Sequence, residues 1–102
     1  MSRAGRSTQA LEPPAGLAER LRPLWAELAA AVSPNIGPAG LEALAAALYL
    51  LRGAQSAIEK DGLIVVDAKG TAVAHPAIQI ERLAGDEIRR WTEKYGQAGG
   101  AF

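Results

Sequence analysis

Few residues of this sequence have the types and spacing that catalysis or metal binding requires. The single histidine, His75, has neither a second histidine nor a cysteine with which to complete a metal site. His75 stands directly before Pro76, and side chains at such a helix start typically bond the free N–H groups of the first turn. We therefore interpret His75 as a helix cap and expect neither a metal nor another cofactor.

Nucleophiles and phosphate-binding loops show no catalytic pattern either. Ser7, Ser33 and Ser56 lack the flanking residues of a nucleophile elbow. The sequence has no P-loop lysine motif and no G-x-G-x-x-G after a predicted strand, and its C-terminal glycines come too late to open a helix over a ligand. The sequence therefore favours a protein that is not an enzyme.

Basic side chains remain as candidates for recognition, because lysine and arginine can contact nucleic-acid phosphates. Eleven basic and eleven acidic residues give a formal net charge of zero, so a DNA contact has to come from a local patch. The candidate DNA-binding residues are Arg3, Arg6, Lys69, Arg82, Arg89, Arg90 and Lys94. Acidic neighbours dilute each of them, and a solvated mixed-charge surface is the alternative interpretation.

Most of these cations belong to a predicted helix that follows Pro76 and ends at Gly96. The apolar positions of this helix recur at helical spacing. They are Ala77, Ile80, Ala84, Ile88, Trp91 and Tyr95. On the charged side, groups one turn apart are predicted to pair, such as Asp86 with Arg90 and Glu87 with Arg90.

A β-hairpin is predicted before this helix, at about residues 63–74. Two β-prone segments flank Gly70, which can adopt the positive φ that a short hairpin loop requires. Gly62 suits the left-handed position after the last turn of the preceding helix. The hairpin is thus a spacer that joins two helices.

The helix before the hairpin is predicted from about Pro38 to Lys60. Its leucines step by three and four residues as in a heptad seam, which Tyr49 and Leu50 widen. The predicted core and oligomer-interface residues are Leu41, Leu44, Leu48, Leu51, Ile58 and Trp91. A stripe this broad would face water against a single neighbour, so we expect contacts on two sides, for one of which another subunit is a candidate. A core helix in a small bundle is the simpler interpretation of the same stripe. Gly53 is unfavourable in mid-helix, and we interpret it as a point where another backbone approaches closely.

A first helix is predicted from Leu17, and it either kinks at Pro23 or begins its regular part there. The fold class is mainly α with a short hairpin, in the order helix–helix–hairpin–helix. Residues 1–15 are a predicted flexible arm, residues 16–96 a single domain and residues 97–102 a flexible tail. No segment approaches the roughly 20 apolar residues of a membrane span, so we expect no membrane partner.

Several sequence marks follow one another in a specific order. They are Trp25 on the first helix, the leucine-rich second helix, Ala57-Ile58-Glu59-Lys60-Asp61-Gly62-Leu63-Ile64-Val65, the turn at Gly70, His75-Pro76-Ala77-Ile78-Gln79-Ile80-Glu81, and the charged run Glu81-Arg82-Leu83-Ala84-Gly85-Asp86-Glu87-Ile88-Arg89-Arg90. This order resembles the small subunit of tailed-bacteriophage terminases, over residues 17–96.

The resemblance implies a non-catalytic DNA-packaging subunit that assembles into a homo-oligomeric ring. Its expected partners are double-stranded viral DNA, the terminase large subunit that holds the ATPase and nuclease, and further copies of itself. Its expected location is the cytoplasm of the infected bacterial host. The hairpin would serve as an assembly element or as a contact for the motor.

Two alternatives stay open. A small helical DNA-binding regulator would use the first two helices as a helix-turn-helix, which requires a tight turn and a basic second helix. The leucine-rich second helix and the proline-rich link before it argue against this alternative. A virion adaptor or structural protein would share the oligomer and lack the DNA contact, so salt-dependent DNA binding separates the readings.

Overall fold

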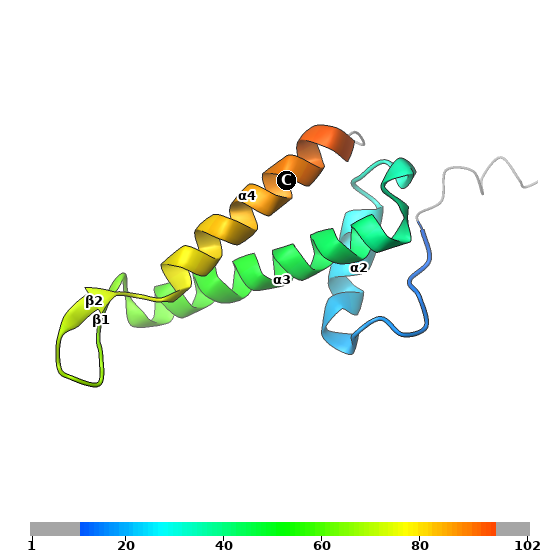
Figure 1. Ribbon diagram of the computed structural model, residues 1–102. Helices are drawn as coiled ribbons and strands as arrows, with labels where there is room; N and C mark the ends of the chain where they lie inside the picture. Colours follow the sequence, from blue (N-terminus) through cyan, green and yellow to red (C-terminus); the bar gives the residue numbers. More distant parts are fainter. Residues whose placement is uncertain (1–10, 96–102) are drawn as a thin grey trace, which may run out of the picture.

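The computed structural model describes residues 11–95, which are mainly helical with one two-stranded antiparallel hairpin (Figure 1). The elements are the 3-10 turn η1 (Glu19–Leu21), α2 (Arg22–Ala29), the 3-10 turn η2 (Pro34–Ile36), α3 (Gly37–Asp61), β1 (Ile64–Val66), β2 (Ala72–Ala74) and α4 (Ala77–Tyr95). The predicted helix–helix–hairpin–helix order is confirmed. The predicted tail and the first ten residues of the predicted arm, with Arg3 and Arg6, lie outside the described residues.

Pro23 determines where the first helix begins. Residues 19–21 form a 3-10 turn, and α2 starts at Arg22 with Pro23 in its first turn, where a missing N–H is not needed. Of the two predicted outcomes, a kink or a late start, the late start is confirmed. The helix ends at Ala29, and the backbone N–H groups of Ala31 and Val32 close its last turn on the Leu28 carbonyl.

The core lies where α2 crosses the first half of α3 (Figure 1). Its largest fully buried side chains are those of Trp25, Leu28, Leu41 and Leu44. The indole Nε1 of Trp25 donates a hydrogen bond of 2.9 Å to the carbonyl of Leu11, and the half-buried Leu11 packs against the core. The predicted domain start at residue 16 stays a prediction.

Helix α4 returns alongside α3 and buries Ala77, Ala84 and Ile88 (Figure 1). Near the C-terminal end of α4, the Trp91 ring lies against Gly40 of α3: an added Cβ at Gly40 would lie 2.8 Å from Cγ1 of Ile36 and 3.1 Å from Cζ3 of Trp91. A side chain at position 40 would therefore displace the Trp91 ring. Gly53 meets nothing within 4 Å among residues 11–95, so this part of the chain supplies no backbone that approaches it.

The hairpin projects beyond the ends of α3 and α4 (Figure 1). Its strands pair with Ile64 opposite Ala74, Val65 opposite Val73 and Val66 opposite Ala72. The predicted positive φ is confirmed at Gly62 (86°) and at Gly70 (83°), where glycine avoids the steric conflict that a Cβ would create.

Candidate functional site

His75 is confirmed as a helix cap. Its Nδ1 accepts a hydrogen bond of 2.9 Å from the Ala77 N–H in the first turn of α4. Its Nε2 lies 3.0 Å from Oδ2 of Asp61, the last residue of α3. One neutral tautomer, with the proton on Nε2, satisfies both bonds. The ring therefore joins the end of α3 to the start of α4 at the base of the hairpin.

Backbone hydrogen bonds also hold the base of the hairpin. The His75 N–H donates to the Leu63 carbonyl at 2.7 Å, and the Gly62 N–H donates to the Ile58 carbonyl at 2.7 Å. Together with the Asp61 contact, these bonds fix the direction in which the hairpin leaves the helices. Within residues 11–95, no group of three or more His, Cys, Asp or Glu side chains is placed to hold a metal ion.

The candidate DNA-binding arginines of α4 are engaged within their own helix. Arg89 pairs with Asp86 at 3.0 Å, and Arg90 pairs with Glu87. The Glu87–Arg90 pair is confirmed, whereas the predicted Asp86–Arg90 pair is wrong: Arg90 is held by Glu87, and Asp86 instead meets Arg89.

Arg82 and Lys94 also have partners on α4. The Arg82 guanidinium donates to the side-chain oxygen of Gln79 at 2.8 Å, and Lys94 lies 5.4 Å from the centroid of the Tyr95 ring. All four basic residues of α4 thus have a neighbour on the same helix, and such exposed contacts are weak enough to exchange.

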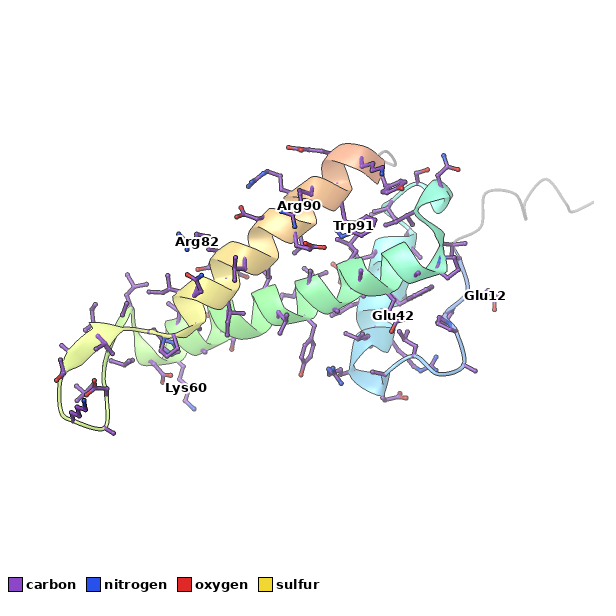
Figure 2. The ribbon with its side chains drawn as sticks, viewed as in Figure 1. Glu12, Glu42, Lys60, Arg82, Arg90 and Trp91 are labelled. Atoms are coloured by element: carbon purple, nitrogen blue, oxygen red, sulfur yellow. The ribbon has the colours of Figure 1, made fainter. Side chains whose placement is uncertain are left out.

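The remaining cations do not gather with them. Lys69 lies in the hairpin loop, far from the C-terminal half of α4 (Figure 1), and Figure 2 shows Lys60 on the opposite side of the α3–α4 pair from Arg82. Residues 11–95 contain nine Lys and Arg against eleven Asp and Glu, a formal charge of −2, because Arg3 and Arg6 precede them. The described part of the chain therefore has no excess of positive charge, and Lys60 and Lys69 do not add to the cations of α4.

Two polar contacts were missed by the sequence analysis. The Arg52 guanidinium on α3 donates to both carboxylate oxygens of Glu27 on α2, at 3.1 and 2.7 Å. This hydrogen bonding lowers the pKa of Glu27 and raises the pKa of Arg52. The Trp91 indole Nε1 donates to Glu87 at 2.8 Å, beside the stacked ring of Tyr95. The Glu87–Trp91 spacing of one turn signals such a contact, whereas nothing in the sequence signals Glu27 and Arg52.

The predicted core and interface residues divide into two groups. Leu41, Leu44 and Leu48 are buried in the core of one chain, and that part of the prediction is confirmed. Their side chains have almost no surface left for a second copy. The other three predicted residues are half-buried: Leu51, Ile58 and Trp91. A contact between subunits would therefore have to use side chains other than Leu41, Leu44 and Leu48.

The exposed apolar side chains form two surfaces. The first, the α3–α4 groove, is a shallow depression of about 240 Å³. It is lined by Tyr49, Leu50, Gly53, Ala54, Ala57, Ala77 and Ile80, and Leu83 lies one turn beyond Ile80. The second, the hairpin face, consists of Ile64 and Val66, and the exposed Leu63 directly precedes β1. The widened leucine stripe signalled the groove, because Tyr49 and Leu50 fall outside the heptad seam.

Comparison of the chain with protein-family models, with curated proteins and with solved structures finds no match in any of the three. No helix between residues 11 and 95 is both long enough and apolar enough to cross a membrane.

Proposed function

We propose that this chain is the non-catalytic small subunit of a phage DNA-packaging terminase. In this role it forms a homo-oligomeric ring, binds double-stranded viral DNA, and regulates a large subunit that holds the ATPase and nuclease, in the cytoplasm of the infected bacterial host. The observation that carries the proposal is the ordered set of marks: the helix stop at Gly62, the hairpin turn at Gly70, the His75 cap and the charged helix α4.

The apolar surfaces support the oligomeric part of the proposal. Seven large apolar side chains in residues 11–95 are exposed, in a domain whose core is otherwise well buried. Clustered exposed apolar side chains mark interaction surfaces more often than isolated ones do. An assembly would remove this surface from water.

The distribution of charge supports a DNA contact only if the weak cationic patch of each copy is repeated in an oligomer. The cations of α4 lie in exposed intrahelical pairs, which are worth little individually and can exchange their carboxylate for a phosphate. In an oligomer, weak patches and the arm residues Arg3 and Arg6 act together, and the effective affinity rises through avidity. Affinity for DNA should then depend steeply on salt.

Native mass and DNA binding test the proposal together on the full chain. We expect a particle of many copies whose affinity for duplex DNA falls by at least tenfold between about 50 and 200 mM salt, because several phosphates are contacted per particle. An R89Q/R90Q variant should reduce the salt slope, and an R22Q/K60Q variant, with the same charge change away from α4 and from the groove, should leave it closer to the parent. A monomer that binds no DNA at low salt would overturn the proposal.

A virion adaptor without DNA contact is the second candidate. It is favoured by the charge of −2 on residues 11–95 and by the pairing of the α4 arginines. An oligomer that binds no DNA at low salt would support this candidate. The helix-turn-helix regulator has less support, because α3 buries Leu41 and Leu44 in the core and would have to expose a polar face to enter a groove of DNA.

A further inference from the structure

We propose that the hairpin face of one copy docks into the α3–α4 groove of a second copy of this chain. The inference deepens the oligomeric part of the proposed function and rests on it, and it does not depend on DNA binding or on a terminase large subunit.

The two short strands of the hairpin leave the apolar side chains of the hairpin face exposed to solvent. The strands have three residues each, and an isolated two-stranded hairpin is marginal in water. Ile64 and Val66 point to one face of the hairpin and are 62% and 68% exposed, whereas Val65 and Val73 pair on the other face and are half-buried. The face that carries Ile64 and Val66 is therefore the more exposed one.

The groove is the matching concave surface. Its floor contains Gly53, Ala54 and Ala57, and a Cβ added at Gly53 would meet no atom within 4 Å. Its rim carries Tyr49 and Leu50, which are 43% and 52% exposed. Glycine in mid-helix costs about 1 kcal/mol relative to alanine, and the open space above Gly53 leaves room for another backbone.

A second copy is the occupant that accounts for both surfaces at once. All seven exposed large apolar side chains of residues 11–95 lie at two places: on the hairpin face with the neighbouring Leu63, and at the groove with its Leu83 extension. Every copy carries one of each, so a single contact repeated between copies covers both surfaces on every chain. A foreign protein bound to one surface would leave the other in water.

The contact is head-to-tail, because the two docking surfaces differ. Contacts of this type generate rings when the rotation closes and filaments when it does not. A copy cannot easily fill its own groove, since the bonds of His75 to Asp61 and to Leu63 hold the hairpin pointing away from the helices (Figure 1). The hairpin therefore stays available to a neighbour.

Cysteine cross-linking tests the contact directly, because the sequence contains no cysteine. Ile64→Cys and Leu50→Cys chains, one of them extended by a solubility tag, are mixed as oligomers and treated with a short bis-maleimide. We expect a mixed cross-linked dimer as the main product. The control mixture pairs Ile64→Cys with Arg82→Cys, which projects from the opposite face of α4 to the groove residue Ile80, and should give little product.

The alternative outcomes separate the two proposals. Self-cross-linking of Leu50→Cys alone would indicate a symmetric groove-to-groove contact, and an oligomer without the mixed product would indicate some other interface. Either result overturns the docking while the oligomer stands. A monomer in native mass measurements at high micromolar concentration overturns the docking and the oligomeric proposal together.

Complementation provides a second test that does not depend on a cross-linking distance. Leu50→Glu blocks the groove and Ile64→Glu blocks the hairpin face, and both positions are more than half exposed, so the fold should persist and circular dichroism checks it. Each variant alone should be monomeric. Their mixture should give dimers and nothing larger, because only one intact hairpin–groove pair is available. A mixture that stays monomeric, or variants that each keep the full assembly, would overturn the docking.

Discussion

Around Trp25, side chains from α2 and the first half of α3 pack until Leu28, Leu41 and Leu44 expose at most 1% of their surface. Around Gly70, at the other end of the molecule, Ile64 and Val66 stay 62% and 68% exposed. The first region has a core that one chain completes, and the second is held by turn geometry and hydrogen bonds. The difference shows that one end of the molecule is stabilised by its own core, whereas the other end keeps large apolar side chains in contact with solvent.

The largest expected effect comes from the core region. Leu44→Ala removes a fully buried side chain and should lower the free energy of unfolding by about 2–5 kcal/mol, because the lost burial is added to the cost of a cavity. Leu50→Ala is the matched control on the same helix, at a half-exposed position, and should change the free energy by no more than about 0.5 kcal/mol in the monomer. Denaturant titration at one low protein concentration measures both. Equal losses would show that the two regions do not differ as described.

The junction between the regions should show an intermediate effect. His75→Ala removes the acceptor of the Ala77 N–H and the contact with Asp61, and should cost about 1 kcal/mol, the usual value of a lost cap. His75→Asn keeps a side-chain oxygen for the Ala77 N–H and should recover part of that loss. Denaturant titration of both variants measures the difference. A larger loss for His75→Asn than for His75→Ala would contradict the capping role.

Substitution of Gly53 should affect stability and assembly in opposite directions. Gly53→Ala should raise the stability of α3 by up to about 1 kcal/mol, because alanine favours the helix and its Cβ meets nothing in the chain. In the proposed docking, the same Cβ enters the groove floor and should lower the fraction of oligomer in sedimentation velocity. Gly85→Ala on α4 is the control, since its Cβ also meets nothing, and it should stabilise without changing assembly. Unchanged assembly in both variants would exclude a close approach at Gly53.

The hairpin end of the fold could be predicted from sequence because its signals are local. Gly62 and Gly70 require positive φ, Pro76 restricts the chain before α4, and the apolar period of α4 is regular. The structure of the core end was harder to predict from the sequence. Pro23 allowed two helix starts, and the choice depends on how residues 17–21 pack against α3.

The candidate site was predictable only where partners lie on one helix. Glu87–Arg90 follows from spacing, yet Asp86 had basic residues both three and four positions away, and side-chain conformation selected Arg89. The contact of Glu27 with Arg52 and that of Gly40 with Trp91 depend on how separate helices are placed. Nothing local in the sequence fixes that placement, because it results from the packing of the whole core.

The smallest expected effect is at the Glu27–Arg52 pair, which joins α2 to α3 in the core region. The bond from Arg52 lowers the pKa of Glu27 in the folded chain, so the folded state binds this proton more weakly than the unfolded state does. The stabilisation is therefore complete above the carboxyl's ordinary pKa and is lost as the pH falls through the lowered value. Both side chains are about half exposed, at 50% and 53%, so solvent screening limits the contribution to about 0.2–1 kcal/mol.

Denaturant titrations of the parent and of Glu27→Gln should give free energies of unfolding that differ by that amount at pH 7 and converge in acid. Glu42→Gln, which changes the same charge at an exposed position of α3, is the control for the loss of a charge alone. A difference for Glu27→Gln that grows as the pH falls would contradict the assignment of this pair to the stability of the core region.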